Sequence, residues 1–199
     1  MIIEQNVTMI VSTCKVNENG RPKCNQFWPA SQEQEPKYSI SQLDENREKI
    51  KIKLLDHVQE SKYLERREME AQRADGSVHK LTQIHFTGWP DHGVPEGAAV
   101  AAFEQMLFKF INWNLNSQAN EKSIVHCSAG IGRTGTTISL METIINICAQ
   151  RNAGLDPEFS LFHTVRRLRE QRYGSVQTYS QYQFMYSFLA SWLQKTFKK

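Results

Sequence analysis

The stretch VHCSAGIGRTG, Val125 to Gly135, places one cysteine, three glycines and one arginine within a single short turn. The apolar run SIVHC leads into it, and GRTGTTISLMETIINIC continues it with helical character. In a strand, turn and helix of this kind, exposed backbone N–H groups converge on one point and the helix dipole adds positive potential there. The stretch therefore predicts an α/β fold in which an anion-binding loop joins a strand to a helix.

Cys127 and Arg133 stand at the two ends of this loop, in the pattern C-x5-R. A thiol and a planar cation with five N–H donors can thus face one bound tetrahedral anion. Donors that hold a phosphate dianion also stabilise a thiolate, which lowers the cysteine pKa from ~8.5 toward roughly 4 to 6. This spacing favours a nucleophile at neutral pH. The alternative is an inert buried cysteine that ends a core strand.

A second stretch, WPDHGVP from Trp89 to Pro95, supplies a candidate general acid, Asp91. Attack by sulfur on a phosphoester requires a proton for the departing oxygen, and a carboxylic acid can provide it. Trp89, two prolines and Gly93 surround Asp91 with rigid and hinge-capable residues, as a closing loop requires. By itself, an aspartate in such a loop is more often a turn former.

Composition limits the classes of protein to consider. A chain of 199 residues with 40% hydrophobic residues can bury one good core, so we expect one domain over residues 1–199. A net charge of +3 is too small to indicate nucleic acid as a partner. Four cysteines without C-x-x-C spacing indicate neither a zinc site nor a disulfide framework, and favour a reducing, cytoplasmic location. No apolar run is long enough for a membrane segment.

Strand patterns occupy the first half of the chain. The run Val7 to Val16 is apolar and β-branched and ends in NENGRP, which predicts a buried strand and a hairpin. Extended chain is expected from Cys24 to Pro29. Residues 49–54, KIKIKL, alternate charge with hydrophobe, and HKLTQIHF from His79 does so more loosely. KYLERREMEAQR, between them, fits either period, and we interpret it as a strand.

Helical patterns occupy the second half. After Pro95, apolar residues recur at steps of three and four, and a later helix is expected through HTVRRLREQR, with Asp156 as its N-cap and Pro157 in its first turn. Thr178 and Gln181 have the spacing of a capping box before a last helix.

Taken together, VHCSAGIGRTG, WPDHGVP and SVQTYSQYQF resemble the cysteine-dependent protein tyrosine phosphatases, specifically their tyrosine-specific branch. Weaker similarity extends over essentially the whole chain. The resemblance implies a twisted, mixed and partly parallel sheet flanked by helices. It also implies hydrolysis of phosphotyrosine in proteins through a phosphocysteine intermediate, with phosphotyrosine-containing proteins as partners and neither a metal nor a cofactor.

The resemblance assigns roles to individual residues. Cys127 attacks phosphorus, Arg133 clamps the equatorial oxygens, and Thr134 assists loss of the thiolate in the second step. Asp91 protonates the tyrosyl leaving group and then accepts a proton from water. The main-chain amides that complete the phosphate cradle belong to Ser128, Ala129, Gly130, Ile131, Gly132 and Arg133.

Supporting roles follow in the same way. Gln177 and Gln181 match the two glutamines that place the hydrolytic water, although ordinary helix capping explains them as well. His126 is expected to lower the pKa of Cys127 through local hydrogen bonds. In the hairpin, Glu18 matches a glutamate that orients the arginine, and Lys23 matches a lysine that contacts the acid loop.

Two further matches concern the rim of the site. Arg169, Arg172 and Gly174 resemble a segment that lines the cleft near the glutamines. His92 follows the acid where many relatives have phenylalanine, so it would contact the substrate ring less well, and Tyr173 stands where proline is common.

The main departure is upstream. Relatives carry an Asn-Arg-Tyr loop whose aromatic residue sandwiches phosphotyrosine, and this chain has no such motif. We therefore expect the domain to be truncated at its N-terminus. One alternative function is accordingly a weakly active or inactive module that binds phosphotyrosine or phosphate. Another is a different C-x5-R enzyme, such as a dual-specificity phosphatase or an arsenate reductase, but the WPD and glutamine motifs argue against it.

Overall fold

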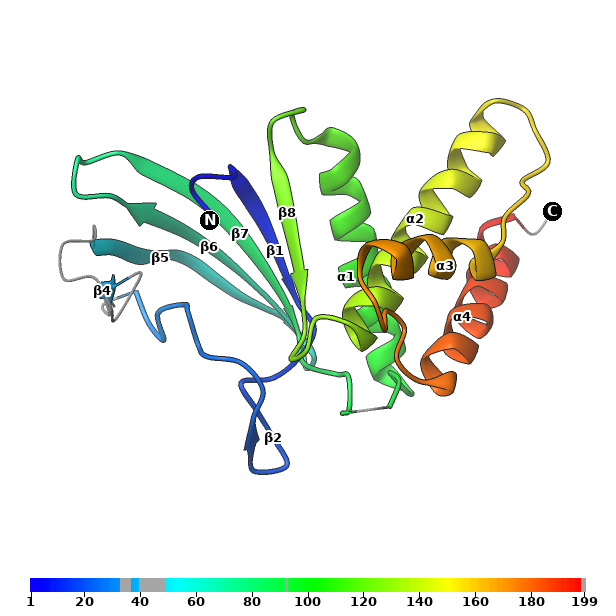
Figure 1. The fold of residues 1–199 in the computed structure, drawn as a ribbon, viewed down its shortest axis with the longest axis horizontal. Coiled ribbons are helices and arrows are strands. Elements are labelled where there is room, and N and C mark those ends of the chain that lie inside the picture. Colours follow the sequence, from blue (N-terminus) through cyan, green and yellow to red (C-terminus); the bar gives the residue numbers. More distant parts are fainter. Residues whose placement is uncertain (33–36, 40–48, 92, 198–199) are drawn as a thin grey trace.

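A six-stranded sheet forms one layer of the molecule. The computed structural model describes residues 1–32, 37–39, 49–91 and 93–197. The strands lie in the order β4-β5-β6-β7-β1-β8 (Figure 1). Their bounds are Val7–Ser12 (β1), Lys37–Ser39 (β4), Lys49–Ser61 (β5), Leu64–Gln72 (β6), Val78–Phe86 (β7) and Lys122–His126 (β8). Because β1 is parallel to both β7 and β8 while the other pairs are antiparallel, the predicted mixed, partly parallel sheet is confirmed.

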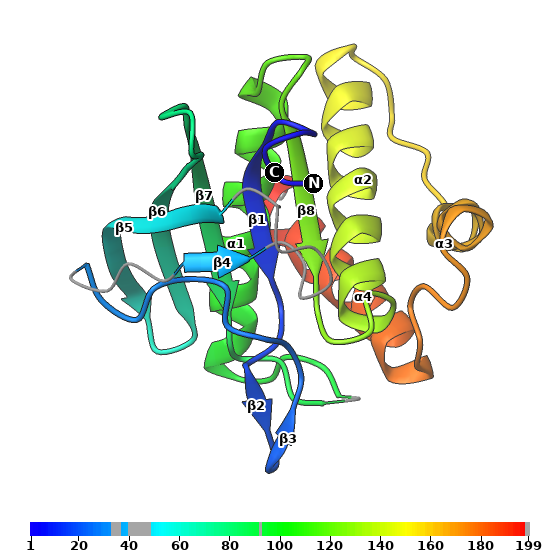
Figure 2. The ribbon, with the colours of Figure 1, turned by 60° about the vertical axis from the view of Figure 1, so that its left-hand side comes forward.

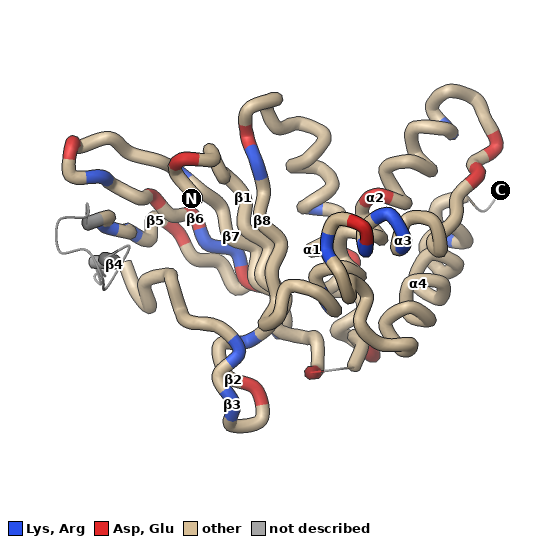
Figure 3. The backbone as a smooth tube through the Cα atoms, in the orientation of Figure 1, with Lys and Arg blue, Asp and Glu red and all other residues tan. Residues whose placement is uncertain are grey.

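The strand that leads to the hairpin is shorter than the sequence suggested. We expected it to run to Val16, but β1 ends at Ser12 and a hairpin of β2 (Asn17–Glu18) and β3 (Arg21–Pro22) follows. The Thr13 amide still donates to the His126 carbonyl at 2.9 Å, and after it the chain turns into the hairpin, where the Lys15 amide donates to the Glu18 carboxylate at 3.1 Å. The hairpin projects from the sheet and carries acidic and basic residues close together (Figure 3).

Four helices in the described residues form the second layer, on one side of the sheet (Figure 1). Their bounds are Ala98–Asn116 (α1), Gly132–Asn152 (α2), Leu161–Gln171 (α3) and Tyr179–Phe197 (α4). The apolar face of α1 packs Phe103, Met106 and Phe110 against Ile84 and Phe86 of β7, as the helical spacing predicted. No helix among these residues combines the length and the apolar character needed to cross a lipid bilayer.

The opposite face of the sheet carries a second, smaller apolar cluster. Trp28, in the segment that follows the hairpin, packs there with Val7, Ile10 and Leu54. Figure 2 shows β1 between β7 and β8, with α1 behind these strands and α2 and α3 to the right of β8. The central strands are therefore buried on both faces, which accounts for the near-continuous apolar run of β1.

The start of α3 differs from the prediction. Asp156 is fully exposed and does not cap the helix, which begins at Leu161 with Ser160 as its N-cap. The side chain of Gln150 binds both the amide and the carbonyl of Glu158, which keeps that segment extended up to Ser160. The capping box of α4 is confirmed: the Gln181 amide donates to Thr178 Oγ1 at 3.2 Å, and the Thr178 amide donates to Gln181 Oε1 at 3.3 Å.

Candidate active site

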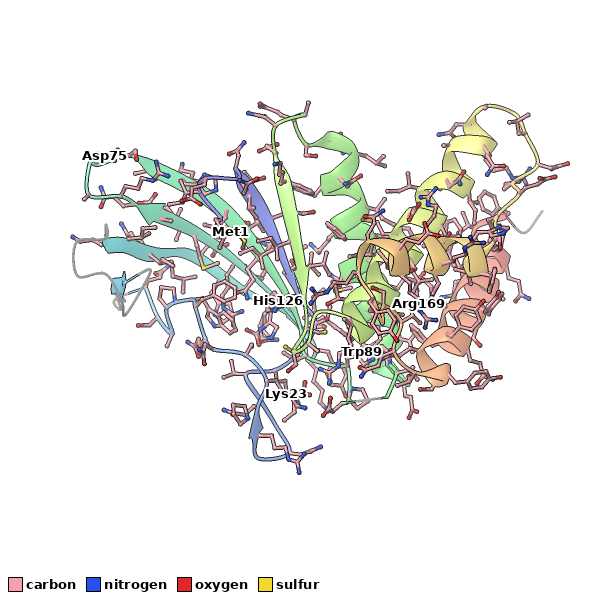
Figure 4. All side chains as sticks on the ribbon, viewed as in Figure 1. Met1, Lys23, Asp75, Trp89, His126 and Arg169 are labelled. Atoms are coloured by element: carbon pink, nitrogen blue, oxygen red, sulfur yellow. The ribbon has the colours of Figure 1, made fainter. Side chains whose placement is uncertain are left out.

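The predicted catalytic residues meet where the carboxyl ends of the parallel strands face the helices. Figure 4 shows Lys23, Trp89 and His126 gathered in this region. Cys127 follows β8 directly, and Arg133 lies in the first turn of α2. They border a pocket of about 130 Å³. Its lining residues are Lys23, Asp91, Cys127, Ser128, Ala129, Gly132, Arg133, Gln177 and Gln181.

The environment of Cys127 favours its thiolate. The side chain is only 7% exposed, and burial by itself raises a thiol pKa. Hydrogen bonds to the sulfur from the Thr134 hydroxyl and from the backbone amides of Thr134, Gly130 and Ile131 outweigh burial, so the pKa of Cys127 is lowered. Among the described residues, the buried Thr134 hydroxyl has no partner other than this sulfur. Several loop amides thus point toward the Cys127 sulfur, as an anion cradle requires.

Arg133 is held as a fixed fork. Its Nη1 and Nη2 donate to the two carboxylate oxygens of Glu18 at 2.6 and 2.7 Å, and Nη1 also donates to the Thr13 carbonyl at 3.3 Å. Burial alone would lower the pKa of Arg133, but the hydrogen bonds and charge of Glu18, with the charges of Asp91 and Cys127, raise it. The guanidinium is therefore a permanent cation of set orientation.

Asp91 reaches over the pocket from the loop between β7 and α1. Its Oδ1 accepts from Arg133 Nη2 at 2.9 Å, and its Oδ2 is ion-paired with Lys23 Nζ. Trp89 anchors this acid loop: the indole is buried against Phe103, and its N–H donates to the Gly93 carbonyl at 2.8 Å. The hairpin lysine and the acid loop are thus in contact, as the resemblance implied. His92 lies outside the described residues.

The two glutamines approach the loop from the other side. Gln181 Oε1 accepts from the backbone amides of Gln177 and Thr178, so only the Nε2 donors of Gln181 remain for the pocket. A Cβ at Gly132 would lie 3.0 and 3.1 Å from the two amide atoms of Gln181, so a larger residue at this position would displace the Gln181 side chain. Gln181 therefore caps α4 and lines the site at once.

Arg169 and Arg172 link α3 to both sides of the site. Arg169 donates to the carbonyls of Ser175 and Val176, each at 2.8 Å, just before Gln177. Val176 is buried and has φ of +58°, a left-handed conformation that a β-branched residue rarely adopts. Arg172 donates to the carbonyls of Ala129 and Gly130 at 3.1 and 3.4 Å, and so supports residues 127–133, the candidate phosphate loop, from outside.

The His126 ring lies against the main chain of Cys127. Its Nδ1 lies 3.2 Å from the Cys127 carbonyl oxygen, and its Nε2 lies 2.7 Å from Ser12 Oγ. Burial lowers the pKa of His126, which favours the neutral ring. The ring thus touches the main chain of Cys127 rather than its sulfur. Ser12 was not singled out from the sequence, because a serine inside a strand gives no local signal of a functional contact.

The family description "Protein-tyrosine phosphatase" matches residues 1–191. The chain belongs to the protein-tyrosine phosphatase family. Among curated members of the family, rat tyrosine-protein phosphatase non-receptor type 9 is 31% identical, and Drosophila melanogaster tyrosine-protein phosphatase corkscrew is 35% identical. Each alignment covers 98% of this chain, but only 32% and 22% of the relative. Tyrosine-protein phosphatase 2 of Dictyostelium discoideum is 30% identical over the whole chain and 49% of its own length. The chain thus spans less than half of these phosphatases.

A solved phosphatase structure confirms the fold. It is described as the structural basis of the PTPN18 fingerprint on distinct HER2 tyrosine phosphorylation sites, and it superimposes with a TM-score of 0.80 at 27% identity. The superposition covers 96% of this chain and 62% of the solved one. The phosphatase fold expected from the sequence is therefore confirmed for this chain.

Proposed function

We propose that this chain hydrolyses phosphotyrosine in proteins through a phosphocysteine intermediate. One observation carries the proposal: a stabilised thiolate, a fixed guanidinium fork and a carboxylate converge on the same pocket. Family membership supports the reaction class, since the relatives are tyrosine-protein phosphatases by name.

The first step transfers the phosphoryl group to sulfur. The thiolate of Cys127 attacks phosphorus, the bond from phosphorus to the tyrosyl oxygen breaks, and Asp91 gives its proton to that oxygen. Arg133 and the loop amides hold the three equatorial oxygens while charge builds on them. Because Asp91 occupies Arg133 Nη2 in this structure, the incoming phosphate takes over this donor and releases Asp91 toward the leaving group.

The second step returns the enzyme to its starting state. Water attacks phosphorus, the bond from phosphorus to sulfur breaks, and Asp91 accepts the proton of the water. Gln177 and the Nε2 donors of Gln181 orient the water, while the Thr134 hydroxyl donates to the departing thiolate. The Gln181 oxygen is engaged by two backbone amides, so its Nε2 donors are the part of that side chain left for this role.

The phosphotyrosine specificity in this proposal rests on the family. The solved relative concerns HER2 tyrosine phosphorylation sites, and phosphotyrosine proteins are the substrates we assign to this chain by analogy. Among the described residues that line the pocket, none is aromatic. A nucleophile that must stay reduced also fits the cytoplasmic location that we propose.

The test is release of phosphate from p-nitrophenyl phosphate by the purified chain, with EDTA present and Cys127→Ser as the control. Turnover that EDTA leaves intact and that the variant loses supports a thiol-dependent phosphatase. Turnover that persists in Cys127→Ser removes the cysteine from the reaction. Folded protein that binds phosphate without turnover contradicts the proposal and leaves the alternative of a binding module.

A further inference from the structure

A row of buried polar side chains crosses four strands on the sheet face opposite the helices. Arg67 of β6 lies opposite Gln83 of β7 in the strand register, and Ser12 of β1 lies opposite His126 of β8. Arg67, Gln83 and Ser12 are 7%, 0% and 1% exposed. Buried polar groups are costly unless they are hydrogen-bonded, so a row of them at this depth calls for a physical account.

Successive hydrogen bonds connect the row to the nucleophile. Arg67 Nη1 donates to Gln83 Oε1 at 3.3 Å, and Gln83 Nε2 donates to Ser12 Oγ at 3.0 Å. Ser12 Oγ lies 2.7 Å from His126 Nε2, and His126 Nδ1 lies 3.2 Å from the carbonyl oxygen of Cys127. A continuous path therefore runs from a buried guanidinium to the first peptide group of the phosphate loop.

The two ends of the path fix the direction of every bond in it. A guanidinium can only donate, so Gln83 must turn its oxygen toward Arg67 and its NH₂ toward Ser12. A carbonyl can only accept, so His126 Nδ1 must carry the proton. Since burial favours the neutral ring, Nε2 is then an acceptor, and the Ser12 hydroxyl donates to it.

Three further side chains keep Arg67 in place. Arg67 Nη1 is also 3.4 Å from His85 Nδ1, and His85 Nε2 donates to the Cys14 carbonyl at 2.8 Å. The Trp28 ring lies over the Arg67 guanidinium at 5.0 Å and packs edge-on against His85. Glu65 supplies the counter-charge through Arg67 Nη2. The donor end of the path is thus neutralised and shielded from water.

We propose that Ser12, Gln83 and Arg67 are positioning residues that lock His126 in its neutral Nδ1–H tautomer and thereby hold the Cys127 main chain in register with the phosphate loop. Without the Ser12 hydroxyl, His126 can place its proton on Nε2, and the bare Nδ1 then faces the lone pairs of the Cys127 carbonyl. The hydrogen bonds from Arg67 to His126 all point the same way, so their dipoles present the positive end to Cys127 and stabilise its thiolate. This stabilisation is lost when His126 changes its tautomer. The expected effect on catalysis rests on the proposed function. The expected tautomer of His126 does not.

The variants Ser12→Ala and Ser12→Thr form the central comparison, because threonine retains the hydroxyl. Ser139→Ala is the matched control, since Ser139 is equally buried and its hydroxyl has no partner in the described part of the chain. Gln83→Met removes the preceding link with a side chain of similar length. Thermal unfolding checks that each variant is folded. If Ser12→Ala does not fold, Gln83→Met takes its place in the test.

The first readout is the ¹⁵N spectrum of the His126 ring, which reports the tautomer without any turnover. We expect Nδ1–H in the unchanged chain, in Ser12→Thr and in Ser139→Ala, and Nε2–H or a mixture in Ser12→Ala and Gln83→Met. A pure Nδ1–H ring in Ser12→Ala overturns the proposal. If the unchanged chain shows this tautomer but has no phosphatase activity, the proposed function fails while the tautomer lock stands.

The second readout is the pH dependence of Cys127 alkylation by iodoacetamide, together with kcat/KM for p-nitrophenyl phosphate. Ser12→Ala should move the alkylation profile to higher pH by about half a unit, as expected for the loss of one favourable dipole. It should lower kcat/KM by roughly 3- to 10-fold, the effect of one hydrogen bond, and Ser12→Thr should restore both. If Ser12→Ala and Ser139→Ala lower kcat/KM equally, the row of polar residues has only a structural role. This result would contradict the proposal.

All variants leave unchanged the other groups that titrate or carry charge near the reporter residues. From the hairpin, the acid loop, α2, β7 and the end of β1, these groups are Glu18, Lys23, Asp91, Arg133, His85 and Cys14. A shift in the profile is therefore attributable to the broken path.

Discussion

The two carboxylate oxygens of Glu18 accept from the two terminal nitrogens of Arg133, so one buried side chain fixes both arms of the other. The side chains are 7% and 5% exposed, respectively. Glu18 belongs to the hairpin and Arg133 to the first turn of α2, 115 residues apart. The hairpin is therefore part of the candidate site, and its contact with Arg133 can be tested by removing one charge.

Glu18→Gln should destabilise the fold by about 3 to 5 kcal/mol, because it breaks the buried pair on both arms of the guanidinium and leaves only the more exposed Asp91 to balance its charge. It should also weaken inhibition by inorganic phosphate, since the fork loses its fixed orientation. Urea unfolding and steady-state inhibition measure the two effects. Asp156→Asn is the matched control: it breaks a pair with Arg151 at 3.4 Å in which Asp156 is fully exposed, and should change stability by less than about 0.5 kcal/mol. Similar effects of both variants would contradict the importance of burial.

Arg133→Lys should lower kcat for p-nitrophenyl phosphate by about 10² to 10³-fold, the cost of removing an oriented donor to transition-state charge. The charge is preserved, but one ammonium cannot serve Glu18 and the phosphate in the same fork geometry. The corresponding change Arg151→Lys, on the exposed end of α2, should leave kcat unchanged. Near-normal turnover in Arg133→Lys would rule out a bidentate clamp.

Selective labelling should identify Cys127 among the four free thiols. The pKa of Cys127 is lowered, whereas burial raises the pKa of Cys14, Cys24 and Cys148. A thiol stops reacting with iodoacetamide once the pH falls below the pKa of that thiol. Cys127 should therefore be the last of the four to lose its reactivity as the pH is lowered. Peptide mass spectrometry after labelling between pH 5.5 and about pH 8.5 tests this order. Preferential labelling of the half-buried Cys24 or Cys148 would contradict it.

Thr134→Val should raise the pKa of Cys127, because it removes the side-chain hydrogen bond that lowers it most. The alkylation profile should move to higher pH, and breakdown of the phosphocysteine should slow. Thr137→Val is a suitable control, since this hydroxyl is also buried in α2 but donates to the Arg133 carbonyl at 3.0 Å. The hydroxyl has no special role if both variants titrate alike.

Asp91→Ala should slow aryl phosphates with poor leaving groups by about 10² to 10⁴-fold, the usual contribution of a general acid. Activated aryl phosphates should lose much less, because their leaving oxygen needs little protonation. A plot of log kcat against leaving-group pKa measures the difference as a steeper slope. An equal loss for all substrates would indicate that Asp91 only organises the pocket through Lys23 and Arg133.

Much of this arrangement could be predicted because its signals are local. The strand, turn and helix around Cys127 follow one another in the chain, and the thiolate cradle comes from consecutive backbone amides. The end of β1 could not be predicted, since it depends on the hairpin folding back to place Glu18 on Arg133. The start of α3 was missed for a similar reason, because the side chain of Gln150 decides it from another helix.

Apart from His126, the row from Arg67 to His126 was not predicted from the sequence. Gln83 and His85 alternate with Ile84 and Phe86 in β7, a pattern typical of a strand with one face in water. They are internal because Trp28 covers this face from a segment that has no regular structure. The sequence of β7 holds one weak sign that this face is buried. Leu81 lies on the same face as Gln83, so this face is not purely polar.

The left-handed turn at Val176 bears on the timing of catalysis. A β-branched residue in this conformation costs about 1 to 3 kcal/mol, and the two carbonyls bound by Arg169 maintain it before any substrate arrives. Gln177 follows immediately and lines the pocket. The distortion is built in when the chain folds, so in the mechanism that we propose Gln177 needs no backbone rearrangement before it acts.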